Sequence, residues 1–229
     1  MTLLEAIEQR RSIRRYLPQP LSLEEVHALQ QQIAECNREG NLHIQLVLNE
    51  KRGFSGIMAY GSFRGVENYL VMAGKKADDL DYRVGYYGQK IVLLAQQLNL
   101  GTCWAGLSYR KIKNTFMLSE DEKVACMIAL GHPNESGRVH KSKTVTDVSN
   151  ADEHTPEWFQ RGVQAALKAP TAVNQQKFSF RYLPPAGTEK AKVKADKGSS
   201  LIGYTLMDLG IAKLHFEIGA GTDHFDWAD

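Results

Sequence analysis

Cysteine is scarce in this sequence: Cys36, Cys103 and Cys126 are the three in 229 residues, and no two of them are closely spaced. A disulfide framework or a cysteine zinc site needs paired cysteines at short spacings, so the pattern excludes both. The seven histidines include no pair at the spacing of a metal-binding helix face. We therefore expect a reducing, cytoplasmic environment and no metal held by protein ligands.

Excess charge of one sign and long apolar runs are also missing. The chain has 28 Lys+Arg against 26 Asp+Glu, a net charge of +2, so composition predicts no nucleic-acid partner. No signal-peptide pattern opens the sequence, and no apolar run is long enough to span a membrane. Hydrophobic residues at 43% and charged residues at 24% are ordinary for a soluble globular protein with a sizeable core.

Helix starts are well marked. A capping box, in which a hydroxyl residue is followed three positions later by glutamate, occurs at Thr2/Glu5, Ser22/Glu25 and Ser119/Glu122. Thr155 before Pro156 predicts a further start, and the helix it opens should end at Pro170.

Strand patterns lie between these helices. Apolar and polar residues alternate over 41–49, 67–74 and 177–183, whereas 124–131 is a continuous apolar run typical of a central strand. Because helices and strands are intermixed, the sequence predicts an α+β (α/β mixed) fold.

Two long segments resemble each other. Residues 84–102 align with 202–222, pairing Gly85-Tyr86 with Gly203-Tyr204, and a capped helix followed by a strand precedes each segment. This order predicts a duplicated unit with subdomains at 1–145 and 150–229. The alternative is that any two amphipathic helices ending in glycine look alike. Gly88 and Gly210, inside the two segments, predict a close crossing of the two helices, because glycine otherwise weakens a helix.

Four sequence clusters contain candidate binding residues. QRRSIRRYLPQP (9–20) surrounds Ser12 with arginines, which is either a solvated basic turn or an anion site. APTAVNQQKF (169–178) carries three amides, which can donate and accept hydrogen bonds to a heteroaromatic ring or simply form a polar loop. GTCWAGL (101–107) has small residues that let backbone N–H groups approach a ligand, and we assign no chemistry to Cys103. GHPNESGRVHKSK (131–143) ends in lysines that suit a phosphate or a solvated linker.

Taken together, RRSIRRY, LNLGTCWAG, IALGHP and APTAVNQQ resemble the flavin-dependent nitroreductase family over most of the chain. The resemblance implies a nitroreductase-like fold that binds FMN. It implies cofactor contacts from residues in all four clusters, with Arg14 stabilising negative charge on the reduced flavin. These residues are Arg10, Arg11, Ser12, Arg14, Ala105, Gly106, Leu107, Lys141, Lys143, Pro170, Thr171, Asn174 and Gln176. Alternation along a strand-like amide segment predicts that Asn174 and Gln176 face the flavin and that Gln175 turns outward.

The order of the motifs departs from that of ordinary members. Their amide motif follows the arginine motif closely, whereas here it comes only at 169–176, and Lys177-Phe178 replaces the usual Pro-Trp. Ordinary members are homodimers with FMN at the subunit interface. The departure resembles the single-chain branch of the family, in which a duplicated monomer imitates the dimer, and predicts one FMN per chain.

The resemblance also implies a reaction. NADH or NADPH delivers hydride to the flavin and leaves, and a nitroaromatic or quinone-type acceptor takes its place. The flavin carries this chemistry, so no side chain is assigned as acid, base or nucleophile. One alternative is a flavin-binding sensor or a degenerate, non-catalytic paralogue, and another is an α/β binding domain without flavin.

Overall fold

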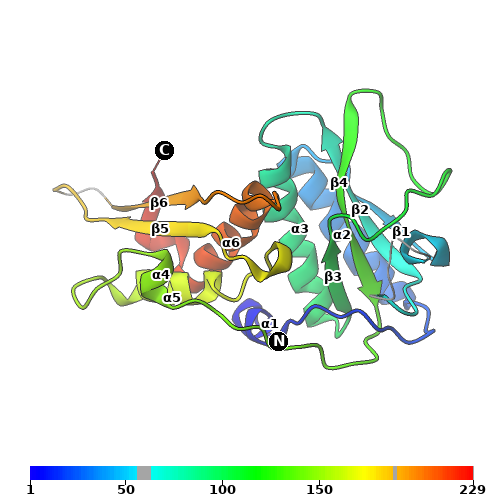
Figure 1. Cartoon of the computed structure of the whole chain (residues 1–229), viewed down its shortest axis with the longest axis horizontal. Helices are drawn as coiled ribbons and strands as arrows, with labels where there is room; N and C mark the ends of the chain where they lie inside the picture. Colours follow the sequence, from blue (N-terminus) through cyan, green and yellow to red (C-terminus); the bar gives the residue numbers. More distant parts are fainter. Residues whose placement is uncertain (56–62, 188–189, 229) are drawn as a thin grey trace.

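The computed structural model describes residues 1–55, 63–187 and 190–228 in two regions that lie side by side, each with its own sheet (Figure 1). The first region carries the helices α1 (Leu3–Gln9), α2 (Leu23–Gly40) and α3 (Leu80–Gln97), with the 3-10 turn η1 (Lys51–Phe54). The second carries α4 (Val145–Val148), α5 (Glu157–Ala166) and α6 (Thr205–Ala220), with the 3-10 turns η3 (Ala172–Asn174) and η4 (Thr222–His224). The mixed α+β class predicted from the sequence is confirmed.

The capping boxes at Thr2/Glu5 and Ser22/Glu25 start α1 and α2 as predicted. The third prediction is wrong. Ser119 N–H donates to Glu122 Oε2 at 2.8 Å, but a strand and not a helix begins at Glu122. The apolar run that follows is buried on both faces of a sheet, and this tertiary burial overrides the local capping signal.

The helix predicted from Thr155 begins two residues later, with Pro156 at the N-cap, because the Thr155 hydroxyl bonds to Asp152 instead of capping. Its apolar face is buried as the spacing indicates, including Phe159 and Val163. The last helical residue is Ala166, and a turn leads from there to Pro170.

The first sheet has the strand order β1 (Gln45–Val47), β2 (Asn68–Lys75), β4 (Glu122–Gly131), β3 (Gly101–Ala105), with every neighbour antiparallel. The apolar run at 124–131 is thus an internal strand, as its composition predicts. The strand predicted over 41–49 is only three residues long, with an isolated bridge from Leu42 to Gly74 before it.

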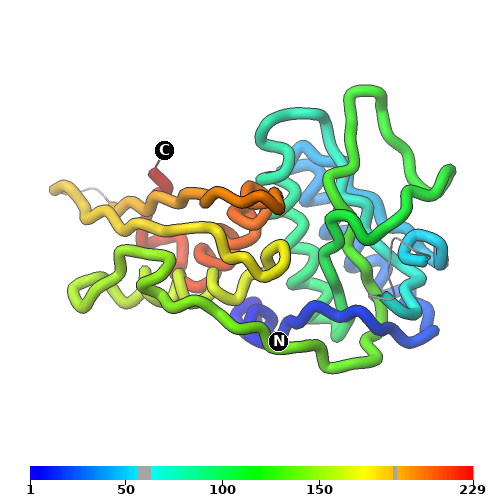
Figure 2. Tube along the Cα trace, in the orientation of Figure 1, coloured from blue at the N-terminus to red at the C-terminus, as the bar shows by residue number. Residues whose placement is uncertain are grey.

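The second sheet consists of β5 (Phe178–Leu183), β6 (Ala191–Lys197) and β7 (Phe225–Trp227). β5 and β6 form an antiparallel pair, and β7 adds to β6 in the parallel direction. The segment 132–144 connects the two regions, running past α1 along one side of the molecule (Figure 2).

The helices α3 and α6 pack against each other where the two regions meet. A Cβ on Gly85 would strike the backbone oxygen of Met207, and one on Gly210 would strike that of Tyr82. The prediction of a close approach is right for Gly210 and wrong for Gly88, which instead faces Met72 and Trp104. In α3, the glycine at the crossing is therefore Gly85.

The largest hydrophobic core crosses the border between the regions, with Leu70 and Ile91 from one side and Val163 and Phe216 from the other. The two sheets therefore share one core at the α3–α6 contact. Within the described ranges, no helix is long and apolar enough to cross a bilayer.

Candidate functional site

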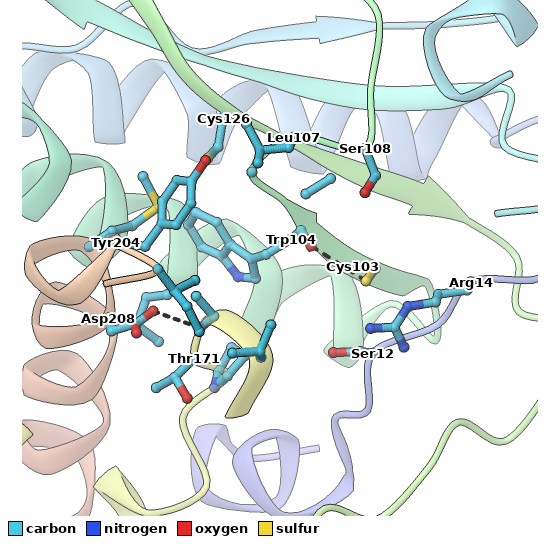
Figure 3. A pocket seen from close by; sticks show the side chains of 18 of the residues that line it. Ser12, Arg14, Cys103, Trp104, Leu107, Ser108, Cys126, Thr171, Tyr204 and Asp208 are labelled. Atoms are coloured by element: carbon cyan, nitrogen blue, oxygen red, sulfur yellow. Dashed lines mark hydrogen bonds between the residues drawn. The ribbon is translucent and has the colours of Figure 1, made fainter. Parts of the chain in front are cut away.

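A cavity of about 370 Å³ opens where the two regions meet, between the end of β3 and the start of α6. Figure 3 shows its walls, with Ser12 and Arg14 on one side and Thr171, Tyr204 and Asp208 on the other. Its lining comprises Ser12, Arg14, Phe63, Cys103, Trp104, Ala105, Gly106, Leu107, Ser108, Cys126, Pro170, Thr171, Ala172, Val173, Ile202, Tyr204, Met207, Asp208 and Ile211. A volume of this size suits a cofactor-sized organic ligand.

The arginine segment runs extended alongside β3. Ile13 N–H donates to Thr102 O at 2.9 Å, and the Tyr16 hydroxyl donates to Ile13 O at 2.6 Å. Ile13 is buried, and in an extended chain its neighbours Ser12 and Arg14 point to the opposite side, where both line the cavity. The buried Ile13 therefore helps to place these two polar residues at the cavity.

Arg10 lies deeper than the rest of this segment. Its side chain is 4% exposed, and no described residue accepts a hydrogen bond from its Nε. Burial lowers the pKa of Arg10 to about 10, which still leaves it cationic at neutral pH. A buried cation without a hydrogen-bonded anion is costly, and this cost points to an anionic ligand.

The loop after β3 supplies backbone to the cavity through Ala105, Gly106 and Leu107. A Cβ on Gly106 would collide with the Tyr204 ring, so glycine is required for this close approach. Burial raises the pKa of the Cys103 thiol, so it stays protonated at neutral pH. This protonated state agrees with our assigning no chemistry to Cys103 from the sequence.

A buried hydrogen-bond chain fixes the cavity residue Trp104. Its Nε1–H donates to Gln89 Oε1 at 3.2 Å, and Gln89 Nε2 lies 2.8 Å from His215 Nε2. His215 Nδ1 lies 3.1 Å from Ala165 O, and burial lowers the pKa of His215 to about 3. The imidazole is therefore neutral, with its proton on Nδ1 and Nε2 accepting from Gln89. Residues of three helices, α3, α5 and α6, thus hold the indole of Trp104 on β3.

The amide loop does not have the strand-like alternation that we predicted. Val173, Asn174 and Gln176 all have positive φ, in a tight turn around η3. Gln176 is buried and accepts from Lys143 N–H at 2.9 Å while donating to Leu167 O at 2.9 Å. Asn174 Nδ2 donates to Lys141 O at 2.7 Å. Both amides thus fasten the 141–143 segment to the loop.

Gln175, which we predicted to turn outward, is the amide that reaches the cavity acid. Its Nε2 donates to Asp208 Oδ2 at 2.7 Å and to Gly203 O at 3.0 Å. Ala172 N–H donates to Asp208 Oδ1 at 3.0 Å. Asp208 is 3% exposed, and burial raises the pKa of its carboxyl to about 6.

The structure brings seven of the thirteen predicted residues together around the cavity: Ser12, Arg14, Ala105, Gly106, Leu107, Pro170 and Thr171. Six are outside its lining: Arg10, Arg11, Lys141, Lys143, Asn174 and Gln176. Arg11 donates to Glu8 O and Arg10 O, and Lys143 Nζ donates to Gln176 O at 2.7 Å.

Sequence reasoning missed several lining residues, above all Trp104, Tyr204 and Asp208. A signal for Asp208 was available, since it is the one acidic residue in the apolar stretch LMDLGIA (206–212). No sequence signal indicated Tyr204, apart from its alignment with Tyr86. Its contact with Gly106 joins segments a hundred residues apart and arises only in the fold.

The mixed α+β fold and the cavity between the arginine segment and the loop at 170–173 describe a ligand-binding protein whose site lies between two regions. The sequence profile of the family described as "Putative TM nitroreductase" matches residues 2–220. The chain belongs to this family and is an oxidoreductase of the nitroreductase type. No curated protein matches the chain by sequence.

Solved structures agree on the fold. A putative nitroreductase from Thermotoga maritima MSB8 superposes with a TM-score of 0.65 at 20% identity, covering 96% of this chain and 83% of that one. A putative nitroreductase from Desulfovibrio desulfuricans, solved in complex with FMN, has a TM-score of 0.54 at 22% identity. The match covers 68% of this chain and 99% of that protein. A putative NADH dehydrogenase/NAD(P)H nitroreductase from Parabacteroides distasonis has a TM-score of 0.51 at 18% identity, covering 64% and 95%.

Proposed function

We propose that this protein binds FMN in the cavity and transfers electrons from NADH or NADPH to nitroaromatic or quinone-type acceptors. The observation that carries the proposal is the cavity with Ser12 and Arg14 on one side and the loop at 170–173 on the other. Arg10, two residues before Ser12 and outside the described lining, adds a buried guanidinium whose Nε lacks a partner among the described residues. Family membership and the FMN complex of the Desulfovibrio desulfuricans structure support flavin as the ligand. The name of the Parabacteroides distasonis protein supports a nicotinamide donor.

The residues present fit this cofactor. Arg10, Ser12 and Arg14 would hold the phosphate and ribityl chain, because guanidinium and hydroxyl groups suit phosphate and hydroxyl oxygens. Backbone N–H groups at 105–107 and the loop at 170–172 would line the planar ring. Gln175 reaches the cavity acid, whereas Asn174 and Gln176 support the loop from behind.

When bound, FMN supplies hydride chemistry, and the chain supplies position and electrostatics. Arg14 would favour the anionic reduced cofactor, since it is the cationic side chain on the described lining. Trp104 forms a rigid apolar wall because the Gln89–His215 chain holds its indole. The second candidate, a flavin-binding protein without turnover, would share these contacts and would not oxidise NAD(P)H in the presence of a quinone.

The first test is FMN titration by fluorescence quenching and visible absorption. We expect Arg10→Met to weaken FMN binding by ~1.5–3 kcal/mol, the range for a hydrogen bond to a charged group. The same variant should stabilise the ligand-free protein, because it removes a buried guanidinium whose Nε has no partner among the described residues. Arg181→Met, on the exposed face of β5, is the control and should change neither quantity. Unchanged FMN affinity in an Arg10→Met, Arg14→Met double variant would refute the assignment.

A second prediction concerns stoichiometry. The arginine segment and the amide loop each occur once and lie in different regions of one chain, so we infer that one monomer closes one FMN site. Light scattering with flavin quantitation should find one FMN per chain on a species near 25.7 kDa. Two FMN per chain in an obligate dimer would contradict the single-chain site and the proposed duplication.

A further inference from the structure

The proposed reaction has a proton requirement that FMN and the nicotinamide donor do not meet by themselves. Reduction of a quinone to a hydroquinone consumes two electrons and two protons. Hydride from NADH or NADPH provides both electrons and one proton. The second proton must come from another group, and this inference therefore rests on the proposed function.

Four titratable side chains besides Asp208 lie on the described cavity lining: Arg14, Cys103, Cys126 and Tyr204. Burial raises the pKa of both cysteine thiols and of the Tyr204 hydroxyl, so these groups hold their protons at neutral pH. Arg14 is a permanent cation. Asp208 is the carboxyl group on the described lining. It differs from the other four groups because its raised pKa, about 6, is close to neutral pH.

Asp208 lies on the first turn of α6 with Met207, Leu209 and Gly210 buried around it. Its carboxyl group accepts one hydrogen bond at each oxygen, from Ala172 N–H and from Gln175 Nε2. Both donors belong to the loop that contains Thr171, and Figure 3 shows Asp208 beside this loop, on the same side of the cavity. The group is thus held at a fixed position, with neither a cation nor a salt bridge to keep it ionised among the described residues.

A neutral carboxyl can donate a proton. Burial favours this form of Asp208, whereas the hydrogen bonds from Gln175 and Ala172 favour the carboxylate. Burial raises the pKa of Asp208 to about 6, close to the pH at which a general acid is most effective. Below this pH the protonated form predominates, and its population falls about tenfold for each pH unit above it. A carboxylate kept only as an anchor for the loop would need no such apolar site.

We propose that Asp208 is a catalytic residue that donates the second proton to the reduced acceptor. The O–H bond of the Asp208 carboxyl breaks, a new O–H bond forms on the acceptor oxygen, and the carboxylate regains a proton from water between turnovers. Both electrons come from the nicotinamide donor, so charge and atoms balance. The acceptors served by this residue are those that must be protonated when they are reduced, such as quinones.

The test compares two acceptors in the FMN-loaded protein. A quinone needs protons, whereas ferricyanide takes up one electron at a time and needs none. Asp208→Asn should slow quinone reduction by about 10²-fold at pH 5.5, a usual contribution of a general acid. Ferricyanide reduction should stay within about threefold of wild type. Asn can still accept from Ala172 N–H, and Asp208→Glu should restore part of the quinone rate.

The pH profile provides a second measurement. Wild-type quinone reduction should fall as pH rises through about 6, and the Asp208→Asn profile should be flat. An equal loss with both acceptors would assign Asp208 to the support of the loop and overturn the proposal, as would an unchanged quinone rate. A wild-type protein that binds no FMN, or reduces neither acceptor, refutes the proposed function and the donor role with it.

A third measurement needs no turnover. Carbon-13 NMR of the aspartate carboxyl groups in the ligand-free chain, with the Asp208 signal assigned by its loss in Asp208→Asn, should give a titration midpoint near 6. A midpoint at the usual value for aspartate would mean that Asp208 is ionised at neutral pH, and the proton-donor role would be withdrawn. Gln175→Met is a matched control, because it removes a donor to the carboxylate and should move the midpoint upward.

Discussion

The two regions of the molecule follow the same order of elements and differ in what they add to it. A helix, two antiparallel strands, a long helix and a strand occur as α2-β1-β2-α3-β3 and again as α5-β5-β6-α6-β7. In the first region β4 lies between β2 and β3, and β3 runs parallel to β2 because both are antiparallel to β4. In the second, β7 pairs directly with β6, also in parallel. The first region thus has an extra central strand within a shared framework.

The long helices differ in a way that bears on the cavity. In the alignment of 84–102 with 202–222, α3 begins before Gly85, whereas α6 begins after Gly203, about two helical turns later. Gly203 and Tyr204, which precede α6 in this alignment, both have positive φ, and Tyr204 lines the cavity. At positions where α3 is helical, the aligned segment of the second region is not, and its Tyr204 lines the cavity. Two regions with the same order of elements can therefore form one cavity between them when the second long helix begins later than the first.

The largest effect on this arrangement should come from the helix crossing. Gly210→Ala places a methyl group against the Tyr82 backbone oxygen, which cannot rotate away, so we expect a loss of about 3 kcal/mol in the free energy of unfolding. Gly88→Ala meets side-chain atoms of Met72 and Trp104 and no backbone atom; the end of Met72 can shift, and helix propensity offsets part of the cost. Its loss should be within about 1 kcal/mol. Urea unfolding measures both, and equal losses would contradict the asymmetry between the two glycines.

The next effect concerns the hydrogen-bond chain that joins the regions. Gln89→Met keeps the volume but leaves Trp104 Nε1 and His215 Nε2 without partners, at a cost of about 2 kcal/mol. Gln89→Glu still accepts from Trp104. It should also raise the pKa of His215 steeply, because a carboxylate then faces the imidazole. The indole N–H resonance of Trp104, assigned by Trp104→Phe, should exchange faster with solvent in Gln89→Met than in Gln89→Glu. Equal exchange in the two variants would refute the chain as the support of the indole.

The smallest effect separates two neighbouring amides. Gln176→Ala removes a buried amide with partners at Lys143 and Leu167, so we expect a loss of about 1.5 kcal/mol. Asn174→Ala removes one exposed hydrogen bond to Lys141 O and should cost about 0.5 kcal/mol. Thermal unfolding of the ligand-free variants gives the ranking. The reverse order would mean that the loop is held in a different way.

Much of the fold could be predicted from the sequence because local signals and tertiary burial agree there. The capping boxes of α1 and α2 and the apolar run of β4 behave as their patterns indicate. The failure at Ser119 has a physical cause, since a capping box stabilises a helix only weakly and the strand that follows gains far more by burial. The strand at 41–49 is short because its continuous pairing with β2 covers three residues, and Leu42 is joined to Gly74 only by an isolated bridge.

The candidate site was predicted unevenly. Ser12 and Arg14 reach the cavity because the alternation of an extended chain is a local property. The amides could not be placed in the same way, since positive φ at Val173, Asn174 and Gln176 breaks the alternation and turns Gln175 toward the cavity. Backbone conformations of this kind depend on the partners that stabilise them, and the partners come from distant segments.

The mixed fold, the starts of α1 and α2, the family and three of the segments that meet at the cavity could be read from the sequence. These follow from short-range patterns of polarity, capping and composition, each readable within a dozen residues. Three features depend on the packing of distant segments: which side chains face the cavity, the burial of Arg10 with no described partner for its Nε, and the burial of Asp208 among apolar residues. Desolvation and hydrogen-bond partnership depend on residues far apart in the chain, so they are set only when α3 and α6 pack together.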